Sequence, residues 1–425
     1  MALVTMRTPS QRTYGPDHDP PNDARSSRSS SSNRSSRCTR SNRPTRAILA
    51  APFIALSVLV ATPASGATAP STPTPVLAPL DKAHTFAQVR HSDRTSTLFV
   101  LGIAGADVSV IDLSELGGLH SADAFDVIKH FDPAALDAMA LRPPRTQRYA
   151  LADLAGVGPR GLDQIAAGTN YSAHGEEVGM AEAFLFPKKS PAIGPRSALT
   201  VAPGTMMDYE VEVCARFDRE LRSVADFDQA RIGFFLCGDY SDRATLIRNL
   251  NLKNVLSGDG FADAKSGHDR FPAGPFLVVP RDWKAFLKDV RIETFVDGQP
   301  RQRADAGDMI KDLRAIVQET LAEAGTRTWS YQGARIPMVG RAAIGTDSAV
   351  LTGTGDGVVF KKPDGATMKA LMTAKNRADQ LAVIDGYIAG EVAKRIYLQP
   401  GNTVLYTSNR LGSILTTVVP AAAAK

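Results

Sequence analysis

Cysteine is scarce in this sequence, with only Cys38, Cys214 and Cys237 among 425 residues. The spacing of so few cysteines does not by itself establish a disulfide. For Cys214 and Cys237 we favour two buried thiols that pack as small apolar side chains. A disulfide between them is the alternative.

Long apolar runs are also missing. The run Ala47–Ala61 is shorter than the roughly 20 residues that a membrane-spanning helix needs. Arginines precede it, and Ser65 and Ala67 provide the small residues of a cleavage site, so we interpret 47–67 as a signal peptide cleaved after Ala67. The sequence therefore predicts an exported protein, periplasmic or secreted, with an uncleaved membrane anchor as the alternative. No Arg-Arg pair supports a twin-arginine signal.

A basic excess is lacking outside the first 46 residues. The formal net charge is +5, but residues 1–46 form an Arg/Ser-rich arm with few large apolar side chains. Such a segment cannot bury enough surface to order itself, so we expect it to be disordered. The remaining chain is close to neutral, which predicts no nucleic-acid partner, although Arg/Ser-rich arms sometimes bind RNA.

The sequence has no internal repeat of solenoid period, and the chain divides by composition. A Pro/Thr-rich linker spans 68–84, a small α+β domain is expected over 85–148, and a larger domain over 149–420. The larger domain reads as many short strands separated by Gly and Pro, with a helical insertion at 360–396. The predicted fold class is α+β and β-rich.

Two shorter segments carry clear local signals. The Asp-Gly pair of Val296–Pro300 predicts a tight hairpin turn. The pattern of Ala306–Gly325 predicts one amphipathic helix.

Carboxylates alternate along one short stretch. Asp208, Glu210 and Glu212 would share one face of a strand, which is costly unless a cation or solvent compensates their charge. Asp239 follows another apolar strand and could supply a further ligand. Oxygen ligands favour Mg²⁺ or Ca²⁺, with Mn²⁺ as an alternative. A solvated polar face is the competing interpretation.

Other polar residues suit catalysis. His174 and Glu177 would touch on a helical turn, where the carboxylate can make the imidazole a better base. Arg243 could bind a substrate carboxylate through two hydrogen bonds. Thr354 lies in the Gly-rich stretch 350–358, whose backbone can approach a ligand closely. The alternatives are a surface ion pair for His174 and Glu177, a structural salt bridge for Arg243, and an ordinary turn for 350–358.

Taken in order, these stretches resemble the fumarylacetoacetate hydrolase family over residues 86–419. The family pattern N-Y-x-x-H-x-x-E matches at Asn170, Tyr171, His174 and Glu177, and D-x-E-x-E at Asp208, Glu210 and Glu212. The pattern N-D-x-S-x-R matches at Asp239, Ser241 and Arg243, with Gly238 in place of its asparagine. The later motifs appear as Lys265 before RFPAGP, then VDGQPRQ, Asp308–Ile310, TGTGDGV, YLQPGN and NRLGSIL.

The resemblance implies a mixed β-roll catalytic domain beside a smaller N-terminal domain, usually in a homodimer. It also implies a divalent metal, usually Mg²⁺, held by Glu210, Glu212 and Asp239. Asp208 would be a structural group next to these ligands.

The implied chemistry is hydrolysis of a C–C bond in a 1,3-diketo acid of the acylpyruvate type. His174 and Glu177 would activate water, and the metal with Lys265 would hold the enolate leaving group. The residues expected to position the substrate are Arg243, Thr354 and Tyr171. Decarboxylation, isomerisation or dehydration of another α-keto acid is the alternative, and so is a degenerate protein that only binds a small acid.

The chain departs from the family pattern at several places. Gly238 replaces an asparagine, Gly355 replaces a proline, and Leu246 stands where many members carry a glutamine. The loss of that glutamine leaves the substrate open. The insertion 360–396 follows the active-site strand and could form a lid, a dimer contact or a plain surface excursion.

Overall fold

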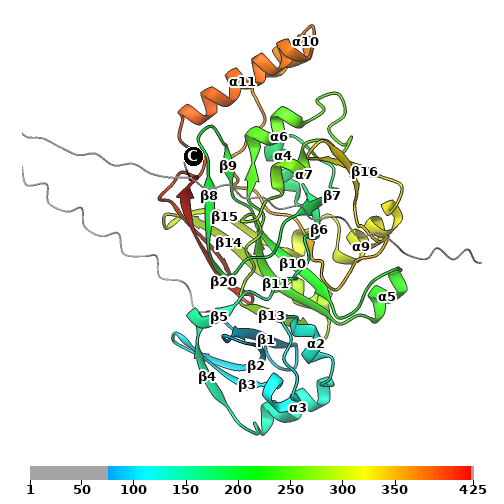
Figure 1. Cartoon of the computed structure of the whole chain (residues 1–425), viewed down its shortest axis with the longest axis vertical. Helices are drawn as coiled ribbons and strands as arrows, with labels where there is room; N and C mark the ends of the chain where they lie inside the picture. The colour runs from blue at the N-terminus through cyan, green and yellow to red at the C-terminus, as the bar shows by residue number, and fades with distance from the viewer. Residues whose placement is uncertain (1–74, 423–425) are drawn as a thin grey trace, which may run out of the picture. The chain divides into compact units, whose positions relative to one another are not determined.

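The computed structural model describes residues 75–422, which fold into a strand-rich α+β structure (Figure 1). The fold class predicted from the sequence is confirmed. The predicted arm at 1–46, the signal segment at 47–67 and the first part of the linker, 68–74, lie outside the described residues. No helix within 75–422 is long and apolar enough to cross a bilayer.

An eleven-stranded sheet runs through the described part of the chain. Its N-terminal strand β1 (Ala83–Arg90) pairs antiparallel with β13 (Phe276–Pro280), so the sheet continues from the predicted small domain into the larger one. The division into two domains, with a boundary between residues 148 and 149, stays a prediction. The other strands of this sheet are β2 (Thr95–Ala104), β3 (Asp107–Asp112), β4 (Gln147–Ala150), β5 (Leu154–Ala155), β6 (Asp163–Gly168), β7 (Phe184–Lys189), β10 (Val211–Phe217), β11 (Ile232–Gly238) and β18 (Val350–Leu351).

A second, five-stranded sheet contains the predicted hairpin. Asp297 and Gly298, between β14 (Arg291–Val296) and β15 (Gln299–Asp305), both have positive φ angles, 50° and 77°. Two successive residues in the left-handed region are what a two-residue hairpin turn requires, and an Asp-Gly pair adopts them at low cost. This sheet comprises β8 (Arg196–Val201), β14 (Arg291–Val296), β15 (Gln299–Asp305), β19 (Thr403–Ser408) and β20 (Gly412–Pro420), and two small ladders pair β9 (Met207–Asp208) with β12 (Ser241–Asp242) and β16 (Thr328–Tyr331) with β17 (Ala334–Pro337).

Most of the helices begin after a capping side chain, with α4 (Ser172–Val178) and α7 (Phe261–Lys265) as exceptions. Asp312 caps α9 (Leu313–Glu323) by accepting the N–H of Ala315 at 2.9 Å, so the single helix predicted over 306–325 begins seven residues late. The remaining helices are α1 (Leu113–Gly117), α2 (Ala124–Ile128), α3 (Pro133–Leu141), α5 (Val224–Gln229), α6 (Arg243–Asn249), α8 (Trp283–Leu287), α10 (Gly365–Thr373) and α11 (Arg377–Ala393).

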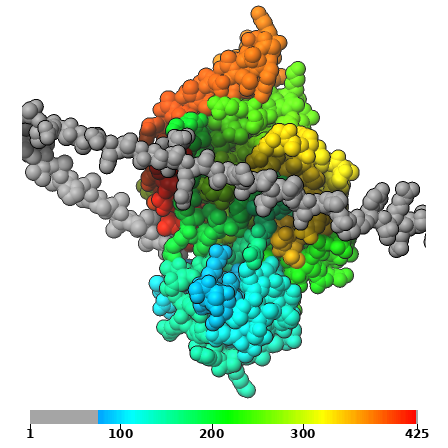
Figure 2. Space-filling model, viewed as in Figure 1, coloured from blue at the N-terminus to red at the C-terminus, as the bar shows by residue number. Residues whose placement is uncertain are grey.

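The insertion contains the last two of these helices, α10 and α11. Asp364 caps the first and Asn376 the second, so the predicted helical run is interrupted between them. Ile384 and Ile388 of α11 are buried in a small apolar cluster with Ile247 of α6. In Figure 2 the orange surface of the insertion accordingly adjoins the green surface around α6.

The two strands that matter most for the site, β10 and β11, are buried along their whole length. Their neighbours in the sheet, β18 and β13, cover both of their edges. Polar side chains at the ends of these strands are therefore withdrawn from solvent and must find partners inside the protein.

Candidate metal centre and active site

Three carboxylates meet at one end of the central strands, and we call Glu210, Glu212 and Asp239 the acidic triad. Glu212 lies within β10, Glu210 directly precedes β10, and Asp239 directly follows β11. The two strands pair with Val211 opposite Gly238, so the ladder itself brings the acids together. One oxygen from each carboxylate lies within 4.8 Å of the others, and all three side chains are buried.

Asp208 stands apart from the triad. It ends β9, and the chain leaves the ladder before β10, so residues 208–213 do not form the single strand that the sequence predicted. Its carboxylate accepts the N–H groups of Val359 and Phe360, each at 3.0 Å, and Arg243 Nε at 3.0 Å. Asp208 therefore fixes the start of the insertion next to the site.

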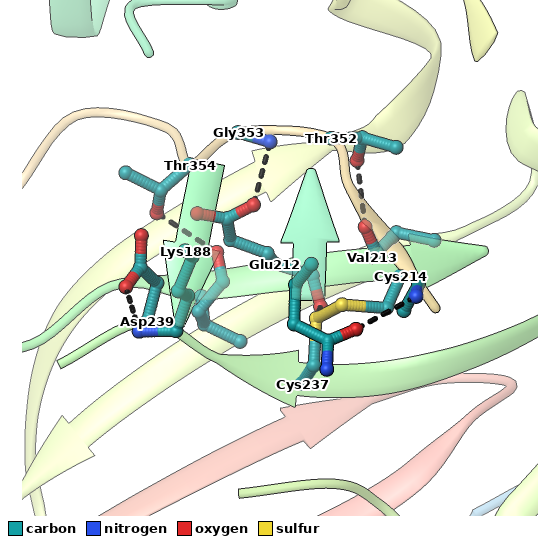
Figure 3. Close-up of a disulfide and its surroundings, with 12 residues drawn as sticks. Lys188, Glu212, Val213, Cys214, Cys237, Asp239, Thr352, Gly353 and Thr354 are labelled. Atoms are coloured by element: carbon teal, nitrogen blue, oxygen red, sulfur yellow. Dashed lines mark hydrogen bonds and ion pairs between the residues drawn. A yellow bond between two sulfur atoms is a disulfide. The ribbon is translucent and has the colours of Figure 1, made fainter. Parts of the chain in front are cut away.

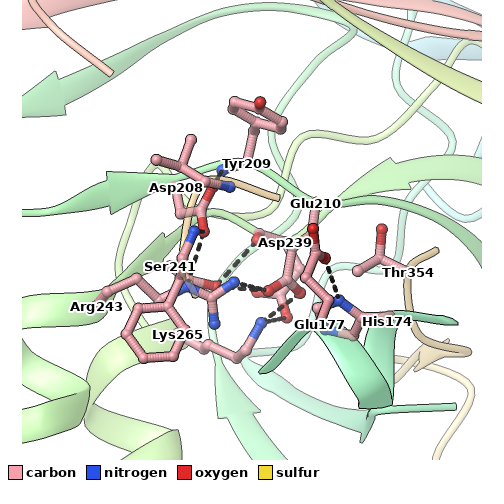
Figure 4. A network of polar contacts seen from close by, with 12 residues as sticks. His174, Glu177, Asp208, Tyr209, Glu210, Asp239, Ser241, Arg243, Lys265 and Thr354 are labelled. Atoms are coloured by element: carbon pink, nitrogen blue, oxygen red, sulfur yellow. Dashed lines mark hydrogen bonds and ion pairs between the residues drawn. The ribbon is translucent and has the colours of Figure 1, made fainter. Parts of the chain in front are cut away.

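Three buried cations face the acids: Figure 4 labels Arg243 and Lys265, and Figure 3 labels Lys188. Lys265 Nζ lies 2.5 Å from Glu210 and 2.8 Å from Asp239, while Lys188 Nζ lies 2.7 Å from Asp239. Arg243 Nη2 donates to Glu210 at 2.5 Å. Burial alone would raise the pKa of Glu210, but the charges of Lys265 and Arg243 outweigh it and lower that pKa to about 2.

Glu212 differs from the other two acids. Within the described residues no cation pairs with it, and its carboxylate accepts the backbone N–H of Gly353 at 2.6 Å. Burial, with the charges of Asp239 and Glu210, raises the pKa of Glu212 well above its usual value. Counting Asp208, four buried carboxylates face three buried cations. This all-oxygen donor set with excess acid fits a hard divalent cation such as Mg²⁺ or Mn²⁺.

His174 and Glu177 form a dyad on α4, as their spacing predicts. His174 Nδ1 lies 3.3 Å from Glu177 Oε2, and the same carboxylate accepts the N–H of Gly357 at 3.1 Å and pairs with Lys361. Burial lowers the pKa of His174 to about 4. The imidazole is therefore neutral at pH 7. When Nδ1–H donates to Glu177, Nε2 is free to accept a proton.

His174 of the dyad and Glu210 of the triad line one cavity of about 170 Å³. Five of the predicted site residues lie on its wall: His174, Glu210, Arg243, Lys265 and Thr354.

Two predicted substrate-binding residues are placed differently from each other. The Thr354 hydroxyl donates to the carbonyl of Val211 at 2.8 Å and accepts from Gln302 Nε2 at 2.9 Å, which fixes its position on the cavity wall. Tyr171 is buried away from that wall, and its hydroxyl has no hydrogen-bond partner among the described residues. The structure thus brings Thr354, but not Tyr171, to the cavity.

Lys188 is a site residue that sequence reasoning missed. It lies in β7 with no exposed surface, and its ammonium contacts Asp239 and the carbonyl of Lys265. In FLFPKK, two successive lysines after an apolar run look like a solvated strand end. One signal in the sequence could have identified it. Lys188 directly continues the apolar run 184–187, and a lysine buried with that run needs an acidic partner.

The residues that form this site lie within a recognised family domain. The model of the fumarylacetoacetate (FAA) hydrolase C-terminal domain matches residues 164–419. The chain belongs to the fumarylacetoacetate hydrolase family. Protein Rv2993c of Mycobacterium tuberculosis is 29% identical over 163 residues, which cover 36% of this chain and 57% of that protein. The chain thus spans little more than half the length of this curated relative.

Solved structures of the same fold are distant in sequence. A fumarylacetoacetate hydrolase from Exiguobacterium antarcticum is 18% identical, with a TM-score of 0.50 over 80% of this chain and 100% of that one. A maleylpyruvate hydrolase from Sphingobium sp., solved with manganese(II) and pyruvate, is 16% identical, with a TM-score of 0.48 over 80% and 100% of the two chains. At such identities the first likeness supports the fold, and the reaction must be argued from the residues of the site.

One departure from the hydrolase pattern has a steric cause. Gly238 stands where the family carries asparagine, and a Cβ at this position would lie 2.4 Å from the ring of Tyr406 and 2.9 Å from Pro272. Tyr406 is fully buried and stacks on Tyr240 at 5.7 Å. The aromatic pair therefore occupies the space that a larger side chain would need.

Cys214 and Cys237 form a disulfide, so the favoured interpretation of two packed thiols is wrong (Figure 3). The bond joins β10 to β11 across a Cα–Cα distance of 5.9 Å. Cys214 follows Glu212 by two residues and Cys237 precedes Asp239 by two. The disulfide therefore links the two strands that carry the acidic triad.

We expect the double substitution Cys214→Ala/Cys237→Ala to lower the free energy of unfolding by about 3 kcal/mol, because it opens a loop of some 23 residues in the unfolded chain. Urea denaturation without reductant measures this. Cys38→Ala is the control, since it removes the thiol outside the pair. Equal stability of the double variant and the control would contradict a role of the bond in stability.

Proposed function

We propose that this family member is a divalent-metal-dependent hydrolase that cleaves a C–C bond in an acylpyruvate-type 1,3-diketo acid. The observation that carries the proposal is the meeting of two chemistries at one cavity. A buried acidic triad suited to a hard cation lies beside a neutral His174 oriented by Glu177.

The chain's own residues account for the proton transfers. His174 Nε2 would take a proton from water as the water oxygen bonds to the distal carbonyl carbon of the substrate. Glu177 stabilises the imidazolium that forms. The C–C bond then breaks, which gives the carboxylic acid, and its electron pair passes to the three-carbon fragment as an enolate. The His174 imidazolium would return its proton to the enolate carbon, which gives pyruvate.

The cations of the site have defined tasks in this proposal. Lys265 faces the cavity and could donate a hydrogen bond to the enolate oxygen, while buried Lys188 holds Asp239 in place. Asp239 and Glu210 keep the pKa of Lys265 raised although burial opposes this, so the donor stays charged. A Mg²⁺ or Mn²⁺ ion held by the acidic triad would act as a Lewis acid on the keto-acid oxygens.

Export and dimerisation are further parts of the proposal. Residues 47–67 carry the signal pattern, and the Cys214–Cys237 bond suits an oxidising compartment outside the cytoplasm. Mapping the N-terminus of the mature protein in cell fractions tests export, and sedimentation tests the homodimer.

We expect acylpyruvates to be converted to pyruvate and a carboxylic acid in the presence of Mg²⁺ or Mn²⁺, with at least about a 100-fold loss of rate in EDTA. Pyruvate release is followed with lactate dehydrogenase, and the second product by mass spectrometry. Carbon dioxide release or an isomerised product of equal mass would instead favour the alternative keto-acid reactions. A rise in Tm without turnover would favour a binding protein.

A further inference from the structure

Away from the reacting groups, the cavity wall is largely apolar. Leu246 and Ile247 of α6 line it, together with Phe184 and Phe186 of β7 and Phe261 of α7. The ring centroids of Phe184 and Phe261 are 4.6 Å apart, and those of Phe186 and Phe261 are 5.6 Å apart. These rings form one continuous aromatic wall.

The aromatic wall reaches the reactive end of the cavity. Lys265 Nζ lies 5.8 Å from the ring centroid of Phe186, and the Arg243 guanidinium lies 5.4 Å from that of Phe360. Both cations are already paired with buried acids. Within the described chain, Lys362 is the remaining cavity-lining cation, and it is exposed at the start of the insertion.

The insertion supplies another part of the apolar wall. Met368 and Leu371 of α10 line the cavity, and Leu371 is only 3% exposed. The packing of Ile384 and Ile388 against Ile247 fixes the insertion to α6. This segment is therefore more than a surface excursion, because it bounds the substrate cavity.

We propose that the cavity accepts an uncharged, apolar acyl group, so that the substrate is a 1,3-diketo acid with an alkyl or aryl end. This inference rests on the hydrolase function proposed above. A second carboxylate at the distal end would be desolvated against phenylalanine and leucine without a spare buried cation, which is costly. An alkyl or phenyl group would instead gain from burial. Apolar cavities of about 150 Å³ in other proteins accommodate benzene, and this one is of similar size.

Leu246 gives the inference a specific anchor. It is 5% exposed and lines the cavity. An amide at this position would present donors and an acceptor to the substrate, whereas leucine offers only apolar contact. Leu246 therefore makes the cavity wall apolar at this point.

The test compares 1,3-diketo acids that share the pyruvate end and differ in the acyl group: acetyl, butanoyl, hexanoyl, benzoyl and a chain of hexanoyl length ending in carboxylate. We expect kcat/KM to rise about fourfold per methylene up to hexanoyl. The carboxylate-ended acid should be at least tenfold poorer than hexanoyl. Met368→Gln should remove most of this chain-length dependence, and Leu246→Gln should do the same if it folds.

Met372→Gln is the matched control, because Met372 lies one turn further along α10 and is 60% exposed. It should keep the chain-length dependence of the unaltered protein. A second readout is the Tm shift caused by the unreactive 2-oxo acids pyruvate, 2-oxohexanoate and 2-oxooctanoate in Mg²⁺, which should grow with chain length.

The outcomes separate the two proposals. Turnover that is independent of chain length, or best with the carboxylate-ended acid, would overturn the apolar-substrate inference and leave the hydrolase intact. No turnover of any diketo acid would overturn the hydrolase, while Tm shifts that grow with chain length would still support the apolar cavity. An equal effect of Met368→Gln and Met372→Gln would also count against the inference.

Discussion

Glu212→Gln is expected to weaken Mg²⁺ or Mn²⁺ binding by at least about 100-fold and to abolish metal-dependent turnover. Glu212 is the triad member without a cation partner among the described residues, so its charge is the one least compensated by the protein. Glutamine keeps the shape and an oxygen that can accept the N–H of Gly353. The substitution therefore removes the charge with little change in packing.

The same variant should be at least as stable as the unaltered protein when no metal is present. Burial and the neighbouring acids raise the pKa of Glu212, so the folded metal-free protein keeps this proton at pH values where the unfolded chain, with a pKa near 4.5, has lost it. Because the folded state then binds more protons, metal-free stability falls as the pH rises above about 4.5, up to the raised folded-state pKa. Glutamine does not titrate, and the variant should lack this decrease.

Metal binding by the unaltered protein should show the matching pH dependence. A metal that binds Glu212 must displace its proton, so the affinity should fall by up to about tenfold for each pH unit below the raised pKa. Calorimetric titration with Mn²⁺ at several pH values measures this. In Glu212→Gln the contribution of this group should vanish.

Glu210→Gln is the informative control for this prediction. It also removes one triad charge, but it leaves Lys265 and Arg243 each without one of their buried partners. Loss of a partner from a buried pair is strongly destabilising. Glu210→Gln should therefore lower the Tm of the metal-free protein, whereas Glu212→Gln should not. Unchanged metal affinity in Glu212→Gln would contradict its role as a ligand.

The parts of this fold that follow local rules could be predicted from the sequence. The Asp-Gly pair at 297–298 specified its own turn, and the spacing of His174 and Glu177 specified a contact within one helical turn. The convergence of the triad needed more, because Glu212 and Asp239 meet only through the ladder between β10 and β11. Periodicity alone could not predict that these three acids converge. The order of the family motifs along the chain predicted it.

Long-range contacts account for what the sequence left open. Pairing of Cys214 with Cys237 depends on the register of two strands, and the role of Lys188 depends on a partner 51 residues away. The late start of α9 has a local cause, since Asp312 competes as a cap within an otherwise helical pattern. The apolar wall at Leu246 likewise appears only when α6, β7 and the insertion are brought together.

Replacing His174 by glutamine should lower kcat by about 10²–10⁴ while leaving the affinity for Mn²⁺ unchanged. The imidazole lies beside the acidic triad but is not one of its oxygen donors, so its loss should affect proton transfer and not metal binding. Because burial lowers the pKa of His174 to about 4, the base stays neutral well below pH 6.5. At saturating metal, the fall of kcat on the acid side should accordingly lie below pH 6.5. At lower metal concentrations, protonation of Glu212 would also lower the rate, because it weakens metal binding. The pH profile is therefore measured at saturating Mn²⁺.

Glu177→Gln tests the orienting half of the dyad. Its amide can still contact His174 and Gly357 but cannot stabilise an imidazolium, so kcat should fall by about 10–100-fold, less than in His174→Gln. Glu176→Gln provides a matched control, because this neighbour on α4 carries the same charge and is exposed to solvent. Equal rates for the Glu176 and Glu177 variants would contradict the dyad, since each substitution removes one negative charge from α4 and only Glu177 contacts His174.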